Sequence, residues 1–274
     1  MNTTVIVAIY VVIDDMMIRL GHHSHSLARV RDAEILTVAV VAAAFCQNHQ
    51  TRALRLLTEL GYLSGPLSIS RFNRRLHALA EWLELLLDTL GELFAHGQAA
   101  IADFVLDSMP LPVCRRVRAR RCRKVRGRVY CGYCAAKQEK VFGWRLHLIC
   151  TPTGLPVAFT MLPASLHDLT PVHELTYGLP AGAYVYADKA YNSAVDEASI
   201  LADTGVRLLP IRKATMPPHL WADELALHTF RKSIETVNSQ LVAMGIQQLK
   251  ARTNAGFEIK VHASLLALTF ANAA

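Results

Sequence analysis

Apolar residues in the first hundred positions recur at helical spacing, and the alternating runs typical of strands are nearly absent. Asp32 is placed to act as an N-cap, and Gly61 is placed to end a helix. The pattern predicts helices over residues 14–20, 33–47 and 51–60. We therefore expect residues 1–100 to form an all-helical region.

A further long helix is expected after the breaker residues 64–66. Ser70 could cap it, and leucines at helical spacing carry the pattern from residue 71 to about residue 96. Its first turns carry Arg71, Arg74 and Arg75. A helical bundle with a basic helix start suits DNA docking, and a solvated helix face explains the same residues equally well.

From about Ala102 the pattern changes to short apolar or alternating runs that are bounded by turn residues, which is typical of strands. Strands are predicted over residues 104–106, 144–150, 155–162, 184–186 and 207–211. Helices are predicted between and after them, over residues 171–177, 193–203, 229–244 and 257–272. Residues 101–274 are therefore expected to form an α/β domain.

Composition indicates a globular protein, because 52% of the 274 residues are hydrophobic and only 19% are charged. Six cysteines without a secretory leader do not suggest a disulfide framework, so a reducing cytoplasm is the expectation. The apolar runs 1–12 and 35–46 are shorter than the ~20 residues of a membrane span. No membrane association is expected.

Basic residues are concentrated in one segment between two predicted strands. The chain carries 29 Lys and Arg against 22 Asp and Glu, a net charge of +7. Without the segment the charge would be −2, so the segment accounts for the basic character. We expect it to be a loop or ribbon that positions DNA phosphates without reading sequence. Its basic residues are Arg115, Arg116, Arg118, Arg120, Arg121, Arg123, Lys124, Arg126 and Arg128.

The same basic insertion, at about residues 114–140, contains four cysteines. Cys131 and Cys134 form a C-x2-C pair, and Cys114 and Cys122 lie upstream. Four thiols could hold a tetrahedral zinc ion, although the spacing of the upstream pair is not that of a zinc ribbon. Reduced free thiols are the alternative.

Two carboxylates follow predicted strands in the same way. Asp107 comes after the apolar run 104–106, and Asp188 after the run 184–187. Because ligands gather at the carboxyl ends of strands in an open α/β sheet, the two could lie side by side if their strands are neighbours. A turn at Asp107 and a helix N-cap at Asp188 are the structural alternatives.

A third acid lies in the predicted helix 229–244. Arg231 stands one turn before Glu235 and Asn238 nearly one turn after it, which places a cation, a carboxylate and an amide along one edge. Three acids from separate elements suit a pair of divalent cations such as Mg²⁺. An exposed i,i+4 ion pair is the simpler explanation for Arg231 and Glu235. His147, His167 and Asp168 are secondary candidates, with structural histidines or a helix cap as the alternatives.

Four segments of the second region stand out: DSMPLPVC at 107–114, FGWRLHL at 142–148, ADKAY at 187–191 and RKSIET at 231–236. In this order they resemble the DDE transposases of bacterial insertion sequences, most closely insertion-sequence family nine-eight-two. The resemblance implies an RNase H-like catalytic domain, built on a mixed sheet with flanking helices, in which Asp107, Asp188 and Glu235 are the catalytic acids and metal ligands. It also implies association with the nucleoid. It covers most of the chain.

The resemblance also implies an activity. Such an enzyme would bind the terminal inverted repeats of its own element in double-stranded DNA and use Mg²⁺, with Mn²⁺ as a substitute, to free a 3′-hydroxyl that attacks target DNA. A homodimer or higher oligomer would hold two ends together. A non-catalytic DNA-binding repressor and a metal-dependent nuclease are the alternatives. DNA contacts are expected from Arg145, Lys189, Arg231 and Lys232.

The chain departs from the broader DDE group at two positions. His228 stands where a Tyr is often found, three residues before Arg231, and Val242 where a Lys is often found. Lys232 or Lys250 could replace that Lys as a contact to DNA.

Overall fold

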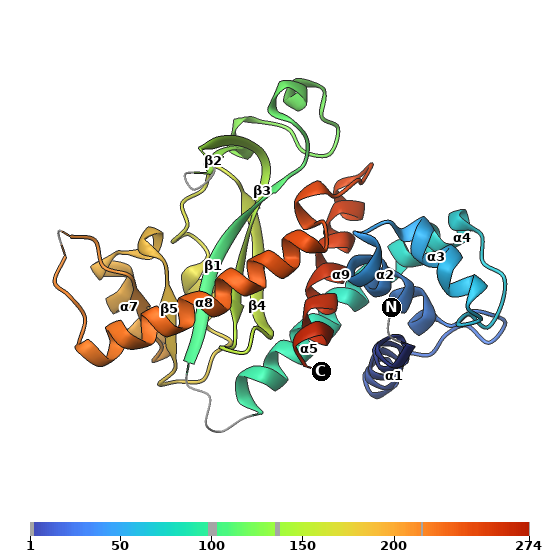
Figure 1. The fold of residues 1–274 in the computed structure, drawn as a ribbon, viewed down its shortest axis with the longest axis horizontal. Coiled ribbons are helices and arrows are strands. Elements are labelled where there is room, and N and C mark those ends of the chain that lie inside the picture. Colours follow the sequence, from blue (N-terminus) through green and yellow to red (C-terminus); the bar gives the residue numbers. More distant parts are fainter. Residues whose placement is uncertain (1–2, 98–102, 135–137, 215, 274) are drawn as a thin grey trace. The chain divides into compact units, whose positions relative to one another are not determined.

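The computed structural model describes residues 3–97, 103–134, 138–214 and 216–273, and it consists of two compact units (Figure 1). One unit contains residues 1–89 and 240–274, and the other contains residues 90–239. Residues 240–274 thus join the N-terminal helices, although the sequence pattern grouped them with the α/β region. The expected boundary between residues 100 and 101 lies outside the described residues.

The first unit is helical, and two of its helices are buried nearly all round. Both α2 and α9 have core residues on every face, with few polar exceptions. A helix that is apolar all round belongs in a core, and these two pack against each other. None of the described helices is long and apolar enough to cross a membrane. The helices of this unit are α1 (Thr3–Arg19), α2 (Asp32–Cys46), α3 (Gln50–Glu59), α4 (Ile69–Ala78), the first part of α5 (Ala80–His96), the 3₁₀ turn η4 (Ile246–Gln248) and α9 (Asn254–Asn272).

The predicted long helix from residue 71 to 96 is wrong, because α4 ends at Ala78 and α5 begins at Ala80. Ser68 caps α4, whereas Ser70 was the expected cap. The backbone of Leu79 leaves the helical region, with φ −102° and ψ 12°. Neither Gly nor Pro marks the break, so the leucine periodicity runs through it and hides it from the sequence.

The N-cap of α2 also differs from the prediction, since Arg31 occupies it and Asp32 is the first helical residue. The Asp32 carboxylate is used elsewhere, because it accepts hydrogen bonds from His22 and Arg75. The Glu34 carboxylate contributes to the cap of α2, because it accepts a hydrogen bond from the backbone N–H of Arg31. The start of α1 at Thr3 extends the predicted helix 14–20 toward the N-terminus.

The second unit is built on a mixed sheet with strand order β2-β3-β1-β5-β6, with β4 also paired to β3. β1 runs antiparallel to β3 and parallel to β5, and β5 runs parallel to β6. This confirms the predicted class, a mixed α/β domain. The strands are β1 (Asp103–Pro112), β2 (Cys131–Cys134), β3 (Glu139–Cys150), β4 (Pro156–Pro163), β5 (Tyr184–Ala187) and β6 (Arg207–Pro210).

Helices cover both faces of this sheet (Figure 1). Alternate strand residues such as Leu106, Val185 and Leu208 join one core cluster with α6 (Val172–Thr176) and α7 (Ala194–Thr204). On the other face, Tyr186 and Leu209 pack with Leu227 and Phe230 of α8 (Trp221–Ala243). Because successive residues of a strand point to opposite faces of the sheet, α8 lies on the face opposite α6 and α7.

Two elements are longer than predicted. β1 continues to Pro112 and does not end at Leu106, because residues 107–112 go on pairing with β3 after the pairing with β5 stops. Prolines are tolerated in such a half-paired stretch, where one side of the strand needs no N–H donor. α8 begins at Trp221, eight residues before the predicted start at Thr229.

Candidate functional site

Asp107 and Asp188 occupy equivalent positions on neighbouring strands. The parallel pairing of β1 with β5 ends at Leu106 and Ala187, and each Asp is the next residue along the chain. The expectation that the two acids lie at adjacent strands is therefore confirmed, with one correction, since Asp107 lies within β1 and not at its end. From this point β1 is paired on one side only, and both aspartates line a pocket there.

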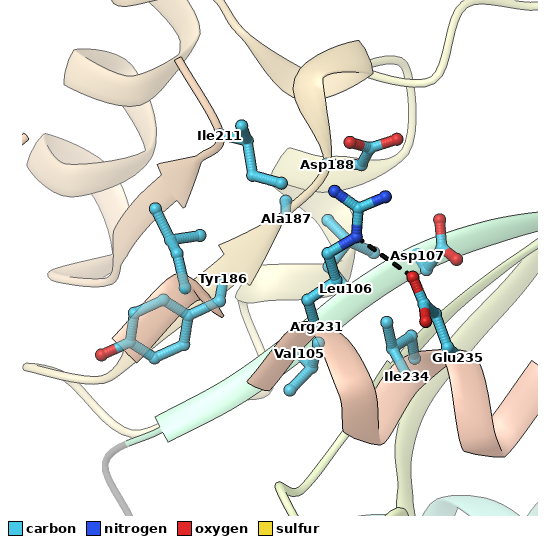
Figure 2. Close-up of a pocket in the computed structure, with 11 residues that line it drawn as sticks. Val105, Leu106, Asp107, Tyr186, Ala187, Asp188, Ile211, Arg231, Ile234 and Glu235 are labelled. Carbon is cyan, nitrogen blue, oxygen red and sulfur yellow. Dashed lines mark hydrogen bonds and ion pairs between the residues drawn. The ribbon is translucent and has the colours of Figure 1, made fainter. Parts of the chain in front are cut away.

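Glu235 is brought to the same pocket by α8. Asp107, Asp188, Arg231 and Glu235 all line one pocket, of about 80 Å³, together with apolar residues of β1, β5 and α8 (Figure 2). A volume of this size accommodates ions or a few waters. The three acids that the sequence singled out thus face a common space. Among the described residues, no three His, Cys, Asp or Glu side chains are gathered closely enough to hold one metal ion.

An ion pair occupies the Glu235 carboxylate. Nε of Arg231 donates to Oε1 of Glu235 at 3.1 Å, and both side chains are more than half exposed. In Figure 2 the guanidinium extends from α8 in the direction of Asp188. An exposed i,i+4 pair contributes only about 0.3–0.5 kcal/mol, so Glu235 can exchange this partner for another cation at small cost.

The Asp107 carboxylate is held in place by two donors. The Ser108 N–H donates to Oδ1 at 2.7 Å, and the Asn238 amide of α8 donates to Oδ2 at 2.7 Å. Burial raises the pKa of Asp107 to about 6, and the nearby charges of Asp188 and Asp168 act in the same direction. The two hydrogen bonds oppose this rise. A divalent cation in the pocket would offset the negative charge of these carboxylates, although the side chains do not converge on one point among the described residues.

Asp188 is exposed, and its Oδ1 accepts the N–H of Lys189 at 2.7 Å. The carboxylate therefore caps the short 3₁₀ turn η3 (Lys189–Tyr191). The alternative that it caps the helix after Tyr191 is wrong, because Ser193 caps α7. An oxygen of Asp188 remains open toward the pocket.

An ion pair that is largely shielded from solvent lies beside the three acids, and the sequence did not predict that its two residues are partners. Asp168 accepts from Ser108 Oγ at 2.8 Å and from Arg145 at 2.6 Å. Both charged side chains are less than a fifth exposed. Asp168 does not cap α6, whose N-cap is Pro171. Arg145, predicted as a phosphate contact, is thus engaged with Asp168.

The two histidines considered as candidates differ in environment. His147 is fully buried in β3, with Nδ1 3.4 Å from the Tyr191 hydroxyl. Burial lowers its pKa to about 4, so the ring is neutral near pH 7. Nδ1 of His167 accepts the Leu169 N–H within a loop. Neither lines the pocket of the three acids.

The basic segment forms a surface excursion from the sheet, as expected. It contains the 3₁₀ turns η1 (Arg116–Arg121) and η2 (Arg128–Tyr130), and it returns through β2 to β3. Lys124 is half-buried and donates to the Val113 carbonyl, whereas the other eight basic side chains are exposed. Lys189 and Lys232, the remaining predicted DNA contacts, are exposed as well.

The four cysteines of the basic segment are free thiols. Cys114 lies beside Cys122, and burial, followed by this neighbour, raises the pKa of Cys114. Cys131 and Cys134 lie at the two ends of β2, where both are half-buried. A zinc site at these residues stays a prediction.

These features define an α/β domain with an acid pocket at the point where two parallel strands part. Residues 97–252 match the family described as the transposase DDE domain, and the chain belongs to this family. Searches among curated proteins and among solved structures found no match. Membership implies DNA binding and nuclease or transposase activity, and DDE transposase domains generally use divalent metals.

Proposed function

We propose that the protein is the transposase of a bacterial insertion sequence, of the type of family nine-eight-two, with an RNase H-like catalytic domain. Asp107, Asp188 and Glu235 are its catalytic acids. The observation that carries this proposal is the placement of the two aspartates directly after Leu106 and Ala187, the last residues that pair β1 with β5, with Glu235 lining the same pocket. The α/β fold and the family membership support it.

In this proposal Asp107, Asp188 and Glu235 hold Mg²⁺, for which Mn²⁺ can substitute. The bound ions supply positive charge that stabilises the phosphodiester transition state and activates the attacking oxygen. Asn238 fixes the orientation of Asp107, and Ser108 contributes its N–H to the same carboxylate. Arg231 holds Glu235 until a metal competes for it.

The reaction has two steps, and a different oxygen attacks the phosphorus in each. Water attacks the phosphorus at the element end, the bond to the 3′-oxygen breaks, and the flank keeps the phosphate. The freed 3′-hydroxyl then attacks target DNA and displaces a 3′-oxygen there. The exposed arginines of residues 115–128, with Lys189, Arg231 and Lys232, contact phosphates, and the N-terminal helical region binds the inverted repeats. A homodimer or higher oligomer pairs two ends.

The test uses the purified full chain, Mg²⁺ and a duplex that carries one end of the element with its flank. Nicking at the 3′ end and joining to a plasmid are measured for the wild type, Asp188→Asn and Asp203→Asn. Asp203 is an exposed acid of α7 that pairs with His173, so it is a matched control outside the pocket. Binding of the duplex is measured in parallel in EDTA.

Nicking and joining by the wild type and Asp203→Asn, but not by Asp188→Asn, is the expected result. Nicking without joined products would favour a metal-dependent nuclease. Specific binding without any cut in Mg²⁺ or Mn²⁺ would reject catalysis and favour a repressor that occupies the element ends.

A further inference from the structure

A large groove lies within the helical unit of residues 1–89 and 240–274, and no step of the proposed chemistry uses it. Its volume is about 1060 Å³. Three stretches of chain contribute to it: the start of α3, the start of α4, and the segment from residue 248 to the first turns of α9. The residues that line it are Gln47, Asn48, His49, Gln50, Thr51, Arg52, Arg55, Ile69, Ser70, Asn73, His77, Gln248, Lys250, Ala251, Arg252, Thr253, Gly256 and Lys260.

The charge of this groove has a single sign. Arg52, Arg55, Lys250 and Arg252 are exposed along it, and no Asp or Glu occurs among its lining residues. None of the four forms an ion pair with an acid of the described residues. Four cations left without partners make the groove attractive to a polyanion.

Three helices begin at this groove. The first turns of α3, α4 and α9 all line it, through Gln50, Ile69 and Thr253 among others. Each helix start presents backbone N–H groups and the positive end of a helix dipole. At α3 the N-cap residue, His49, makes no side-chain capping bond, and the N–H groups of Gln50 and Arg52 donate to backbone carbonyls instead. Converging helix starts add to the attraction from the four exposed cations.

A buried cation forms part of the groove wall. Lys260 is only 8% exposed, and its Nζ donates to the Asn48 carbonyl at 2.6 Å. Asn48 is fixed in turn, because its amide donates to the Met244 carbonyl and to Ser264. Burial lowers the pKa of Lys260 to about 8, and no acid offsets this effect. An anion in the groove would supply the missing counter-charge.

We propose that this groove binds the sugar-phosphate backbone of double-stranded DNA. Its volume and its exposed cations from separate segments exceed what one phosphate needs, and they suit several phosphates along a strand. Gln47, Gln50, Asn73 and Gln248 add neutral side-chain donors, which together with helix starts are common phosphate contacts. The groove would be an anchor for the DNA on which the acid pocket acts, so the inference builds on the proposed function.

The experiment measures fluorescence anisotropy of a labelled mixed-sequence duplex of roughly 30 base pairs, with the full chain in EDTA, so that no cleavage occurs. The double variant Arg52→Gln/Arg55→Gln removes two groove cations. The control, Arg19→Gln/Arg207→Gln, removes two exposed arginines outside the groove and thus changes the net charge equally. Circular dichroism checks that both variants fold like the wild type.

We expect the groove variant to bind the duplex at least about tenfold more weakly at 0.1 M KCl. The slope of log K against log [KCl] should fall by about 1–2, as for the loss of one or two phosphate contacts. The control should stay within about threefold of the wild type. Equal weakening by both variants, or none by the groove variant, overturns the proposal.

Two further measurements separate other ligands from duplex DNA. Lys260→Met removes the buried cation while keeping an apolar stem of similar length, and it should weaken binding of the duplex by about threefold or more. Labelled single-stranded RNA of the same length serves as a competitor, and tighter binding of RNA than of the duplex would overturn the proposal. Asp203→Asn, which lies outside the groove and the acid pocket, should bind like the wild type. If the wild type does not cleave DNA while the groove variants lose binding as expected, only the proposed function is rejected.

Discussion

The side-chain amide of Asn238 donates a hydrogen bond of 2.7 Å to the Asp107 carboxylate, although 131 positions separate the two residues along the chain. Through this bond α8 is fastened to β1 beside the acid pocket. Asn238 therefore acts as a positioning residue for Asp107 and for the helix that carries Glu235.

Replacement of Asn238 by Ala should lower the rate of DNA nicking by about tenfold or more. A hydrogen bond to a charged group contributes about 1.5–3 kcal/mol, and its loss would free the carboxylate to rotate. Single-turnover nicking with Mg²⁺ at several concentrations measures the effect. Ser239→Ala, at the next and exposed position of α8, is the control, and an equal loss in both variants would contradict the positioning role.

Arg231→Gln should leave the stability of the protein unchanged to within about 0.5 kcal/mol, because the pair with Glu235 is exposed. Nicking should nevertheless fall, since Arg231 is expected to contact DNA beside the acids. Urea unfolding tests the predicted stability, and nicking assays on the same preparation test the predicted loss of activity. A variant that is less stable by more than about 2 kcal/mol would show that the pair is structural.

Asp168→Asn should destabilise the fold by about 3 kcal/mol, because it leaves the buried guanidinium of Arg145 without its counter-charge. The remaining partners of the guanidinium are neutral, since it donates to the Tyr133 carbonyl and to Ser108 Oγ, so neither replaces the lost charge. Asp203→Asn, in the exposed pair with His173, should cost less than about 1 kcal/mol. Denaturant unfolding measures the loss of stability in both variants. An equal loss would contradict the prediction that the less exposed pair matters more for stability.

Gly91→Ala should destabilise the α/β unit, although Ala is normally the better residue in a helix. A Cβ at Gly91 would lie 2.1 Å from the Val157 carbonyl oxygen of β4, so α5 would have to move away from the sheet. A cost of about 1–3 kcal/mol is expected. Gly178→Ala, where a Cβ meets nothing within 4 Å, should be nearly neutral. Thermal unfolding compares the two, and a stable Gly91→Ala variant would rule out the close approach.

Because His262 is buried, the free energy of unfolding should decrease as the pH is lowered. Burial lowers its pKa to about 4 from an ordinary 6.5, so between these values the unfolded chain binds more protons and stability falls as pH decreases. Between pH 7 and pH 5 the wild type should lose about 2 kcal/mol more than His262→Gln. Urea unfolding at both pH values measures the difference, and parallel losses would contradict the expected burial effect.

A local pattern in the sequence was enough to single out the two aspartates, because each follows an apolar run, but it did not show that β1 continues past Asp107 to Pro112. Asn238 was recognised only as a neighbour of Glu235 on the helix, since its contact with Asp107 depends on how α8 crosses the sheet. The break at Leu79 escaped detection because no Gly or Pro interrupts the leucine spacing. The groove could not be predicted either, because its cations come from segments nearly 200 positions apart that only the packing of α9 against α2 brings together.

The pairing of α2 with α9 sets an order of events during synthesis. The first four helices leave the ribosome long before residues 240–274, so their apolar core stays open until the last part of the chain arrives. Until then a chaperone, or the exposed helices of another nascent chain, can occupy the place of α9. A chain cut short after α8 would lack every core residue that α9 contributes, together with Lys260 and the hydrogen bond of Asn48 to Ser264.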